Sequence, residues 1–305
     1  MRDVIIIGGG PAGLTAALYS ARAGLDTVII EKAFAGGQMA TTYSVENYPG
    51  FVEGINGAEL AMKMEAHARQ FGAEIMNETV KQVMPEGMIK TVKTENTVYQ
   101  AKTVILAMGA YPNELGFEKE KMLRGRGVSY CATCDGAFYK DKTVAVVGGG
   151  NVAAEDALFL SRFCSKVYVI HRRESLRATG VIQEQMKKNN KIEFYWNTVV
   201  EDILGESQVT GLKLSNVKTH ETREISVNGV FIAIGTSPDT ELVKDKIEMN
   251  SAGYIITDDN MQTNLFGVYA AGDVREKLLK QIVTAVSDGA VAAYMAEKYI
   301  TEFKW

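Results

Sequence analysis

The feature that most constrains the fold is a glycine pattern that occurs twice, each time directly after a short apolar run. Val4–Ile7 leads into Gly8-Gly9-Gly10-Pro11-Ala12-Gly13, and Thr143–Val147 leads into Gly148-Gly149-Gly150-Asn151-Val152-Ala153. In such a unit the apolar run is a buried parallel strand. The first glycine makes the tight turn, the second lets the backbone approach a pyrophosphate, and the last small residue lets the next helix pack on the strand. Each copy therefore predicts a strand–turn–helix unit that binds a dinucleotide.

The residue that follows the second strand differs between the two units. Thr27–Ile30 leads into Glu31, at the offset where an acid accepts a hydrogen bond from a ribose hydroxyl. Lys166–Ile170 leads into His171-Arg172-Arg173, with Arg177 shortly after. His171 lies as many residues after the second glycine pattern as Glu31 lies after the first. Guanidinium groups pair with phosphate, whereas a carboxylate would repel it. The second site is therefore expected to prefer NADP(H), and the alternative is a solvated basic turn.

The order of the remaining segments predicts an α/β fold with two Rossmann-like nucleotide-binding domains, the second inserted into the first. The alternating residues over 73–100 predict short antiparallel strands, and Thr103–Met108 predicts a further apolar strand. Pro238 and the charged stretch to Lys246 mark the return to the first domain. The expected limits are 1–113 with 246–305 for the first domain and 114–245 for the second. Asp273 then follows a last strand, where it is placed to hold a ribityl or ribose hydroxyl.

Two cysteines precede the second fingerprint, in Cys131-Ala132-Thr133-Cys134-Asp135. This spacing lets two thiols form a small ring and lowers the pKa of one of them, so that exchange can proceed through a mixed disulfide. A metal site would need more ligands, but Cys164 is isolated and the histidines are scattered. An inert structural pair is the other alternative. Asp135 is expected to exchange a proton with the dithiol or to cap a helix, and Cys164 to be a buried small hydrophobe.

Composition excludes several classes of protein. The chain has 305 residues and a formal net charge of -4, so neither nucleic acid nor an anionic membrane is an expected partner. No run approaches the roughly 18 apolar residues of a membrane span. Three cysteines with one close pair do not resemble a secreted disulfide framework, and a cytoplasmic location is expected.

Taken together, these motifs resemble the low-molecular-weight, bacterial-type thioredoxin reductases over essentially the whole chain. The resemblance also rests on Gly36-Gly37-Gln38, Glu46-Asn47-Tyr48-Pro49-Gly50, and Gly272-Asp273-Val274 with Gln281. It implies FAD in the first domain, NADPH in the second, a homodimer, and thioredoxin as the protein substrate. It implies that Cys134 faces the flavin, Cys131 engages thioredoxin and Asp135 supplies the proton. It also implies a set of cofactor-binding residues beyond the fingerprints, namely Gly37, Gln38, Asn47, Gly272, Asp273, Gln281 and Ile282.

The chain departs from the family pattern at two places. Met108 stands where the family usually has Thr, and Asn151-Val152 stands where an acid and a serine are more frequent. The second departure bears on affinity for the nicotinamide nucleotide and leaves the fold unaffected. Two other functions are compatible with the architecture. A ferredoxin–NADP reductase would not need the dithiol, and a flavin-containing sensor would not turn over.

Overall fold

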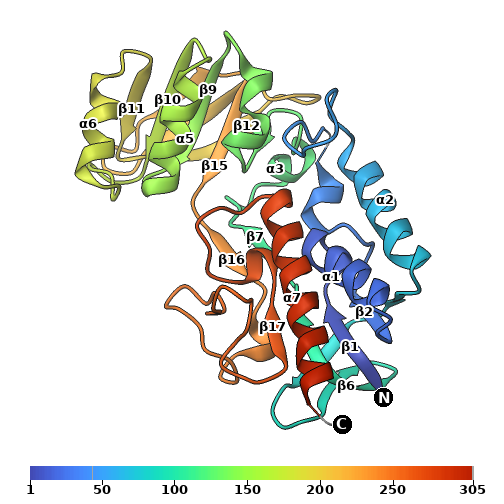
Figure 1. Cartoon of the computed structure of the whole chain (residues 1–305). Coiled ribbons are helices and arrows are strands. Elements are labelled where there is room, and N and C mark those ends of the chain that lie inside the picture. The colour runs from blue at the N-terminus through green and yellow to red at the C-terminus, as the bar shows by residue number, and fades with distance from the viewer. Residues whose placement is uncertain (43, 304–305) are drawn as a thin grey trace. The chain divides into compact units, whose positions relative to one another are not determined.

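A computed structural model describes residues 1–42 and 44–303 (Figure 1). The chain divides into two compact units, Met1–Tyr111 with Ser237–Trp305 and Pro112–Thr236. The chain thus returns to the first unit earlier than residue 246, the limit expected from the sequence. The reason lies in a small sheet of two strands, β7 (Ala110–Pro112) and β16 (Thr236–Pro238), which pairs the two segments where the chain crosses between the units.

A seven-stranded sheet forms the centre of the first unit, in the order β3-β2-β1-β6-β5-β4, with β17 also paired to β6. β1, β2, β3, β6 and β17 run parallel, while β4 and β5 are antiparallel. β3 therefore does not belong to the antiparallel set expected over residues 73–100. The bounds are β1 Arg2–Ile7, β2 Thr27–Glu31, β3 Glu74–Asn77, β4 Val80–Met84, β5 Lys90–Thr94, β6 Val98–Leu106 and β17 Val268–Ala270.

The helices of the first unit are α1 (Pro11–Arg22), α2 (Gly57–Gln70) and α7 (Ile282–Glu302), with the 3₁₀ turns η1 (Gly37–Thr41), η3 (Glu241–Val243) and η4 (Gly272–Val274). α1 and α7 lie side by side, blue and red in Figure 1. Small residues allow this approach, since a Cβ at Gly289 would lie 2.2 Å from the carbonyl oxygen of Ala12. The close packing places the N-terminus of α1 and the turn η4 next to each other.

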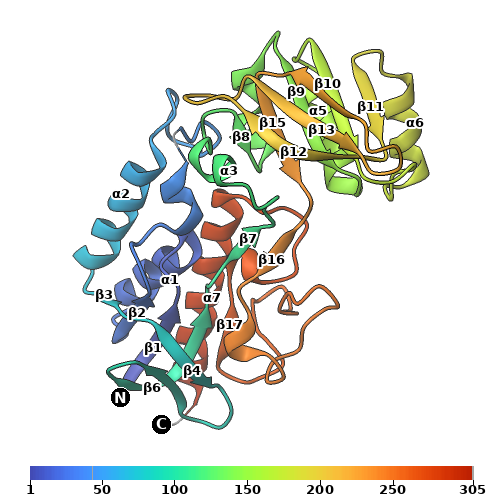
Figure 2. The ribbon, with the colours of Figure 1, turned by 180° about the vertical axis from the view of Figure 1, so that it is seen from behind.

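The second unit is built on a five-stranded parallel sheet in the order β11-β10-β9-β15-β8 (Figure 2). An antiparallel sheet of β12, β13 and β14 adjoins it in the same unit. The strands are β8 Val128–Ser129, β9 Thr143–Gly148, β10 Lys166–His171, β11 Ile192–Trp196, β12 Thr198–Leu204, β13 Gly211–Asn216, β14 Thr222–Ser226 and β15 Gly229–Ala233. The helical segments are α3 Glu118–Met122, α4 Ala132–Asp135, η2 Gly136–Tyr139, α5 Asn151–Ser161 and α6 Gly180–Lys188.

Both units have a strand–turn–helix–strand core with buried aliphatic residues on the two faces of the parallel sheet. The fold class expected from the sequence, two Rossmann-like domains with one inserted into the other, is confirmed. Within the described residues no helix is both long enough and apolar enough to cross a membrane.

Candidate functional site

The first fingerprint turn joins β1 to α1 in a conformation that requires glycine. Gly8 has φ +101°, and a Cβ there would lie 2.4 Å from the carbonyl oxygen of Ala107. A Cβ at Gly13 would lie 1.9 Å from the carbonyl oxygen of Gly8, so the helix packs directly on the turn. Gly10 is the N-cap of α1, Pro11 follows it, and a Cβ at Gly10 would meet no atom within 4 Å. The free N–H groups of α1 therefore face open space suited to a diphosphate.

Glu31 lies at the end of β2 and is held against this turn. Its Oε2 accepts from the N–H of Gly9 at 2.7 Å, and its Oε1 accepts from the N–H of Ala33 at 3.0 Å. A carboxylate has about four acceptor positions, so Glu31 keeps lone pairs for a ribose hydroxyl. Gly37 also borders the turn, because a Cβ there would lie 3.2 Å from the Cα of Gly10.

The turn η4 brings an acid from the far end of the chain to the same helix. Gly272 has φ +79°, and a Cβ there would lie 2.9 Å from the Cβ of Ala12. Asp273 follows it, and within the described part of the chain its Oδ1 is buried without a hydrogen-bond partner. Burial raises the pKa of the Asp273 carboxyl, and the ammonium groups of Lys277 and Lys280 oppose that shift. A buried acceptor without a donor fits a ligand hydroxyl.

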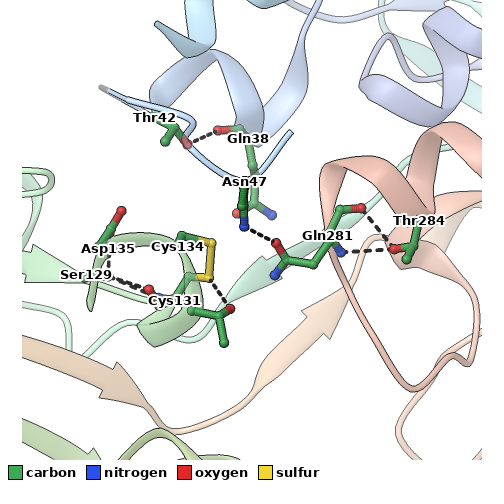
Figure 3. The surroundings of a disulfide bond; sticks show 10 residues. Gln38, Thr42, Asn47, Ser129, Cys131, Cys134, Asp135, Gln281 and Thr284 are labelled. Carbon is green, nitrogen blue, oxygen red and sulfur yellow. Dashed lines mark hydrogen bonds between the residues drawn. A yellow bond between two sulfur atoms is a disulfide. The ribbon is translucent and has the colours of Figure 1, made fainter. Parts of the chain in front are cut away.

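Two amides and the start of α7 complete this group. Asn47 Nδ2 donates to Gln281 Oε1 at 3.0 Å (Figure 3). Gln281 is the N-cap of α7, where its N–H donates to Thr284 Oγ1 at 3.2 Å. The amide of Gln38 donates to the carbonyl oxygen of Ala110. Ile282 begins α7 and packs against the apolar cluster of Met39, Val45, Ile55, Leu60 and Ala61.

The second fingerprint repeats the geometry of the first. A Cβ at Gly148 would lie 2.4 Å from the carbonyl oxygen of Ala233, as Gly8 lies against Ala107. Gly150 is the N-cap of α5, and a Cβ there would also meet no atom within 4 Å. Asn151 opens α5 and accepts from the N–H of Thr179 at 2.9 Å. The N-terminus of α5 is thus as open as that of α1.

His171 lies beneath this turn, in the place that Glu31 takes in the first unit. A Cβ at Gly149 would lie 2.2 Å from the His171 ring. The side chain is buried, and its Nε2 has no hydrogen-bond partner within the described part of the chain. Burial lowers the pKa of the imidazole. A hydrogen bond with the backbone of Ser175 raises this pKa, and the positive charge of Arg177 lowers it.

The three arginines lie on the surface after β10. Arg172 and Arg173 line an open pocket of about 380 Å³ together with Glu174, Ser175, Asn197, Val217 and Lys218. Arg177 is exposed, and its backbone N–H donates to the carbonyl oxygen of Gly149 at 2.6 Å. The backbone of Arg177 therefore links the basic cluster predicted from the sequence to the second fingerprint turn.

Cys131 and Cys134 form a disulfide at the short helix α4, with their Cα atoms 5.3 Å apart. The carbonyl oxygen of Cys131 accepts from the N–H groups of Cys134 at 3.3 Å and Asp135 at 3.1 Å. The Sγ of Cys131 lies 3.4 Å from Thr133 Oγ1. Asp135 accepts from Ser129 at 2.6 Å. The structure thus brings the three predicted residues together in one turn.

Three polar residues near these sites are not among those that the sequence predicts. Ser129 precedes the dithiol and contacts Asp135. Glu120 is fully buried and accepts from the Tyr130 hydroxyl at 2.7 Å, while its carboxylate also accepts from the N–H of Gly116 at 2.8 Å. In the first unit, Asp288 accepts from the N–H of Gly272 at 3.0 Å. Asp288 lies in a largely apolar helix, which is a signal that the sequence offers, whereas Glu120 lies among charged residues and gives none.

The third cysteine takes no part in this chemistry. Cys164 is fully buried and reduced, among the apolar residues of the second unit. Burial raises the pKa of its thiol to about 11. The expectation of a small buried hydrophobe is confirmed. In the described part of the chain, no group of three or more His, Cys, Asp or Glu side chains is arranged to hold a metal ion.

Comparison with known proteins identifies the family. Residues 2–289 match the family described as pyridine nucleotide-disulphide oxidoreductase. Thioredoxin reductase of Peptoclostridium acidaminophilum is 49% identical over 304 residues, covering 98% of this chain and 96% of the relative. Thioredoxin reductase of Bacillus subtilis is 48% identical over 303 residues, covering 99% and 96%. The crystal structure of thioredoxin reductase from Streptococcus pyogenes superposes with a TM-score of 0.95 at 47% identity, covering 99% of both chains. This chain therefore belongs to the pyridine nucleotide-disulphide oxidoreductases, flavin- and pyridine-nucleotide-dependent enzymes, and within them to the bacterial-type thioredoxin reductases.

Proposed function

We propose that this protein is a thioredoxin-disulfide reductase that transfers electrons from NADPH through FAD and the Cys131/Cys134 dithiol to oxidised thioredoxin. The observation that carries the proposal is the disulfide at α4, which lies in a unit with its own dinucleotide fingerprint. The relatives of this chain are named thioredoxin reductase. We also propose that it is a cytoplasmic homodimer, as the family resemblance implies.

In this proposal the first unit, Met1–Tyr111 with Ser237–Trp305, binds FAD. The open N-terminus of α1 suits the diphosphate, and the lone pairs of Glu31 suit a ribose hydroxyl. The buried, unpartnered Oδ1 of Asp273 suits a hydroxyl of the ribityl chain. When bound, FAD supplies a two-electron exchange between reduced nicotinamide and a disulfide. The proposed FAD-binding residues are Gly8, Gly10, Pro11, Ala12, Gly13, Glu31, Gly37, Gln38, Asn47, Gly272, Asp273, Gln281 and Ile282.

The second unit, Pro112–Thr236, is proposed to bind NADPH. The N-terminus of α5 is open in the same way as that of α1, which suits a second diphosphate. The arginines beside His171 favour a 2′-phosphate, because guanidinium groups bind phosphate through paired hydrogen bonds. No carboxylate stands at the position of His171 to repel that phosphate. The proposed NADPH-binding residues are Gly148, Gly150, Asn151, His171, Arg172, Arg173 and Arg177.

The dithiol passes its electrons to thioredoxin in two exchange steps. The Cys131 thiolate attacks one sulfur of the thioredoxin disulfide, forms a mixed disulfide and releases one thioredoxin thiolate. The Cys134 thiolate then attacks the Cys131 sulfur, which re-forms the intramolecular disulfide and releases the second thiolate. The two protons that the dithiol loses balance those that the two thioredoxin thiolates gain. Cys131 is thus the sulfur proposed to engage the partner, and Cys134 the one proposed to face the flavin.

Asp135 is proposed to supply the proton when the disulfide opens. Its backbone N–H donates to the carbonyl oxygen of Cys131, which fixes the residue in the turn that carries both sulfurs. Over one cycle, NADPH and one solvent proton reduce one disulfide of thioredoxin to a dithiol. Asp135 needs only to pass a proton between solvent and a cysteine sulfur.

The test is a comparison of NADPH and NADH as donors with thioredoxin and ferredoxin as acceptors, using the purified yellow protein. We expect rapid, repeated reduction of thioredoxin with NADPH and its loss in Cys134→Ser. Reduction of ferredoxin that survives in Cys134→Ser would instead indicate a ferredoxin–NADP reductase. A protein that binds FAD but does not turn over with either acceptor would indicate a sensor. A colourless protein that takes up no FAD would refute the proposal altogether.

A further inference from the structure

Ser129 links the acid of the dithiol turn to its first cysteine. The residue ends β8, where it pairs with Phe231 of β15, so its backbone belongs to the parallel sheet. Its side chain is buried. The Oγ lies 2.6 Å from Asp135 Oδ2, 3.1 Å from the nitrogen of Cys131 and 3.3 Å from the carbonyl oxygen of Cys131 (Figure 3). A single hydroxyl thus has three polar neighbours in the redox-active segment.

The direction of each hydrogen bond follows from the number of donors. The N–H of Cys131 can only donate, so the Ser129 oxygen accepts there. The carbonyl oxygen of Cys131 has two lone pairs, and the N–H groups of Cys134 and Asp135 already use them. The hydroxyl proton therefore goes to the Asp135 carboxylate. The distance of 2.6 Å is typical of a hydroxyl that donates to an ionised carboxylate.

We propose that Ser129 positions Asp135 for proton transfer in the dithiol cycle. It donates to the carboxylate and at the same time accepts from the backbone N–H of Cys131. The inference rests on the proposed function, in which Asp135 supplies the proton. Ser129 acts through Asp135 and is a positioning residue. Because its own backbone belongs to the sheet, its hydroxyl gives the acid a fixed point of attachment.

Loss of the hydroxyl has a predictable effect on the pH profile. A hydrogen bond donated to a carboxylate favours the ionised form, so its removal favours the protonated form. If Asp135 must be protonated to act, the rate falls as pH rises and the acid loses its proton. In Ser129→Ala this alkaline fall is expected about one pH unit higher, the shift that corresponds to one charge-assisted hydrogen bond.

Other titrating groups near the turn need to be separated from this effect. α4 packs against η2 and α5. On η2, burial and the charge of Asp135 raise the pKa of Tyr139 to about 12, above the range of the assay. On α5, burial and the adjacent Glu155 raise the pKa of Asp156 to about 7. The sulfurs of Cys131 and Cys134 also titrate once reduced. The shift is therefore measured in an Asp156→Asn background as well, where it is expected to persist.

The experiment compares Ser129→Ala and Ser129→Thr with Ser161→Ala, all as FAD-loaded protein. Ser161 is the matched control, because it is a buried serine of the same unit that donates to the carbonyl oxygen of Leu158 and accepts from Asn189. We expect the alkaline shift in Ser129→Ala, its absence in Ser161→Ala, and restoration by Ser129→Thr. Flavin bleaching by NADPH without thioredoxin should stay within about twofold of wild type, since Ser129 acts after that step.

Two further comparisons decide the outcome. In an Asp135→Asn background, Ser129→Ala should change the profile no further, since the serine acts through the acid. A second readout is the pH dependence of iodoacetamide labelling of the reduced cysteines, which should change in Ser129→Ala and not in Ser161→Ala. The inference would be overturned if the wild type and a folded Ser129→Ala variant gave superimposable pH profiles. If the alanine variant does not fold, Ser129→Gly takes its place in this comparison. Absence of thioredoxin reduction in the wild type would refute the proposed function, and the labelling readout would still decide the role of Ser129.

Discussion

Asp288→Ala is the change in the first unit with the clearest structural consequence. The Asp288 side chain is 10% exposed, and its Oδ2 accepts from Lys277 Nζ at 2.7 Å, where the Lys277 side chain is 8% exposed. The same oxygen accepts from the N–H of Gly272 at 3.0 Å. The variant therefore leaves a buried ammonium group without its carboxylate and a buried N–H without an acceptor.

Removing one partner of a buried ion pair costs about 3–5 kcal/mol of folding free energy. For a unit of this size, each kcal/mol lowers Tm by about 2–4 °C, so we expect the first unit to melt about 10 °C lower. Gly272 adjoins Asp273, which is proposed to hold a FAD hydroxyl. We therefore also expect the dissociation constant of FAD to rise by about tenfold, which corresponds to about 1.4 kcal/mol.

The assay is calorimetric unfolding of apoprotein and FAD-loaded protein, together with titration of apoprotein by FAD fluorescence. Asp288→Asn keeps an acceptor for Gly272 and should cost less than Asp288→Ala. Asp288→Leu with Lys277→Met replaces the pair by apolar groups and should recover most of the loss, because such replacements are often neutral. Asp259→Ala, at an exposed acid of the same unit, is the control. The reasoning would be refuted if Asp288→Ala melted within about 1 °C of wild type. It would also be refuted if the stability losses of Asp288→Leu and Lys277→Met simply added in the double variant.

Three further predictions follow from the second unit. Arg172→Ala with Arg173→Ala should raise the Michaelis constant for NADPH by about tenfold or more while that for NADH changes little, which steady-state kinetics checks; equal effects on both would contradict the phosphate assignment. Cys164, with its pKa raised to about 11 by burial, should stay unlabelled by iodoacetamide in the native, reduced protein at pH 8 while Cys131 and Cys134 react, as peptide mass spectrometry can show. Burial lowers the pKa of His171 below its ordinary value of 6.5, so between these two values the unfolded chain binds a proton that the folded protein does not. Stability should therefore fall on acidification below about pH 6.5 more in wild type than in His171→Gln, and parallel Tm-against-pH curves would argue against a neutral buried imidazole.

The sequence predicts the fold well wherever the reason for a residue is local. Gly13 is required by its contact with the carbonyl oxygen of Gly8, within one strand–turn–helix unit, and Gly148 lies against the side chain of Ala153 in the same local way. A pattern that short can be recognised without knowledge of the rest of the chain. The strands before each fingerprint are likewise continuous apolar runs, as strands buried on both faces must be.

The prediction is weaker where pairing between distant segments decides the outcome. Glu74–Asn77 alternates like the strands that follow it, yet it pairs parallel with β2 and extends the nucleotide-binding sheet. Ile192–Trp196 pairs parallel with β10 and so extends the nucleotide-binding sheet of the second unit. The return to the first unit comes at Ser237, since the strand over Thr236–Pro238 pairs with β7. None of these partners is visible in the segment itself.

The same limit applies to the residues that support the site. Cys131, Cys134 and Asp135 are recognisable because their chemistry depends on spacing along the chain. Ser129 and Asp288 act through hydrogen bonds whose partners only the fold brings near. A buried serine or aspartate in an apolar stretch is a weak signal on its own, because many such residues only satisfy a neighbouring backbone group.

The internal duplication provides a stronger argument about selectivity than either half alone. Glu31 and His171 have the same offset from their fingerprints, and each lies directly under the middle glycine, Gly9 or Gly149. The carboxylate of Glu31 accepts from the N–H of Gly9, whereas the His171 ring occupies that space with an unpartnered, neutral Nε2. One backbone geometry thus presents a negative charge in the first unit and none in the second. A 2′-phosphate would be repelled by the first arrangement and tolerated by the second, where the exposed arginines add attraction. His171→Glu should consequently shift preference from NADPH towards NADH, and an unchanged ratio of the two specificity constants would show that the arginines alone determine the choice.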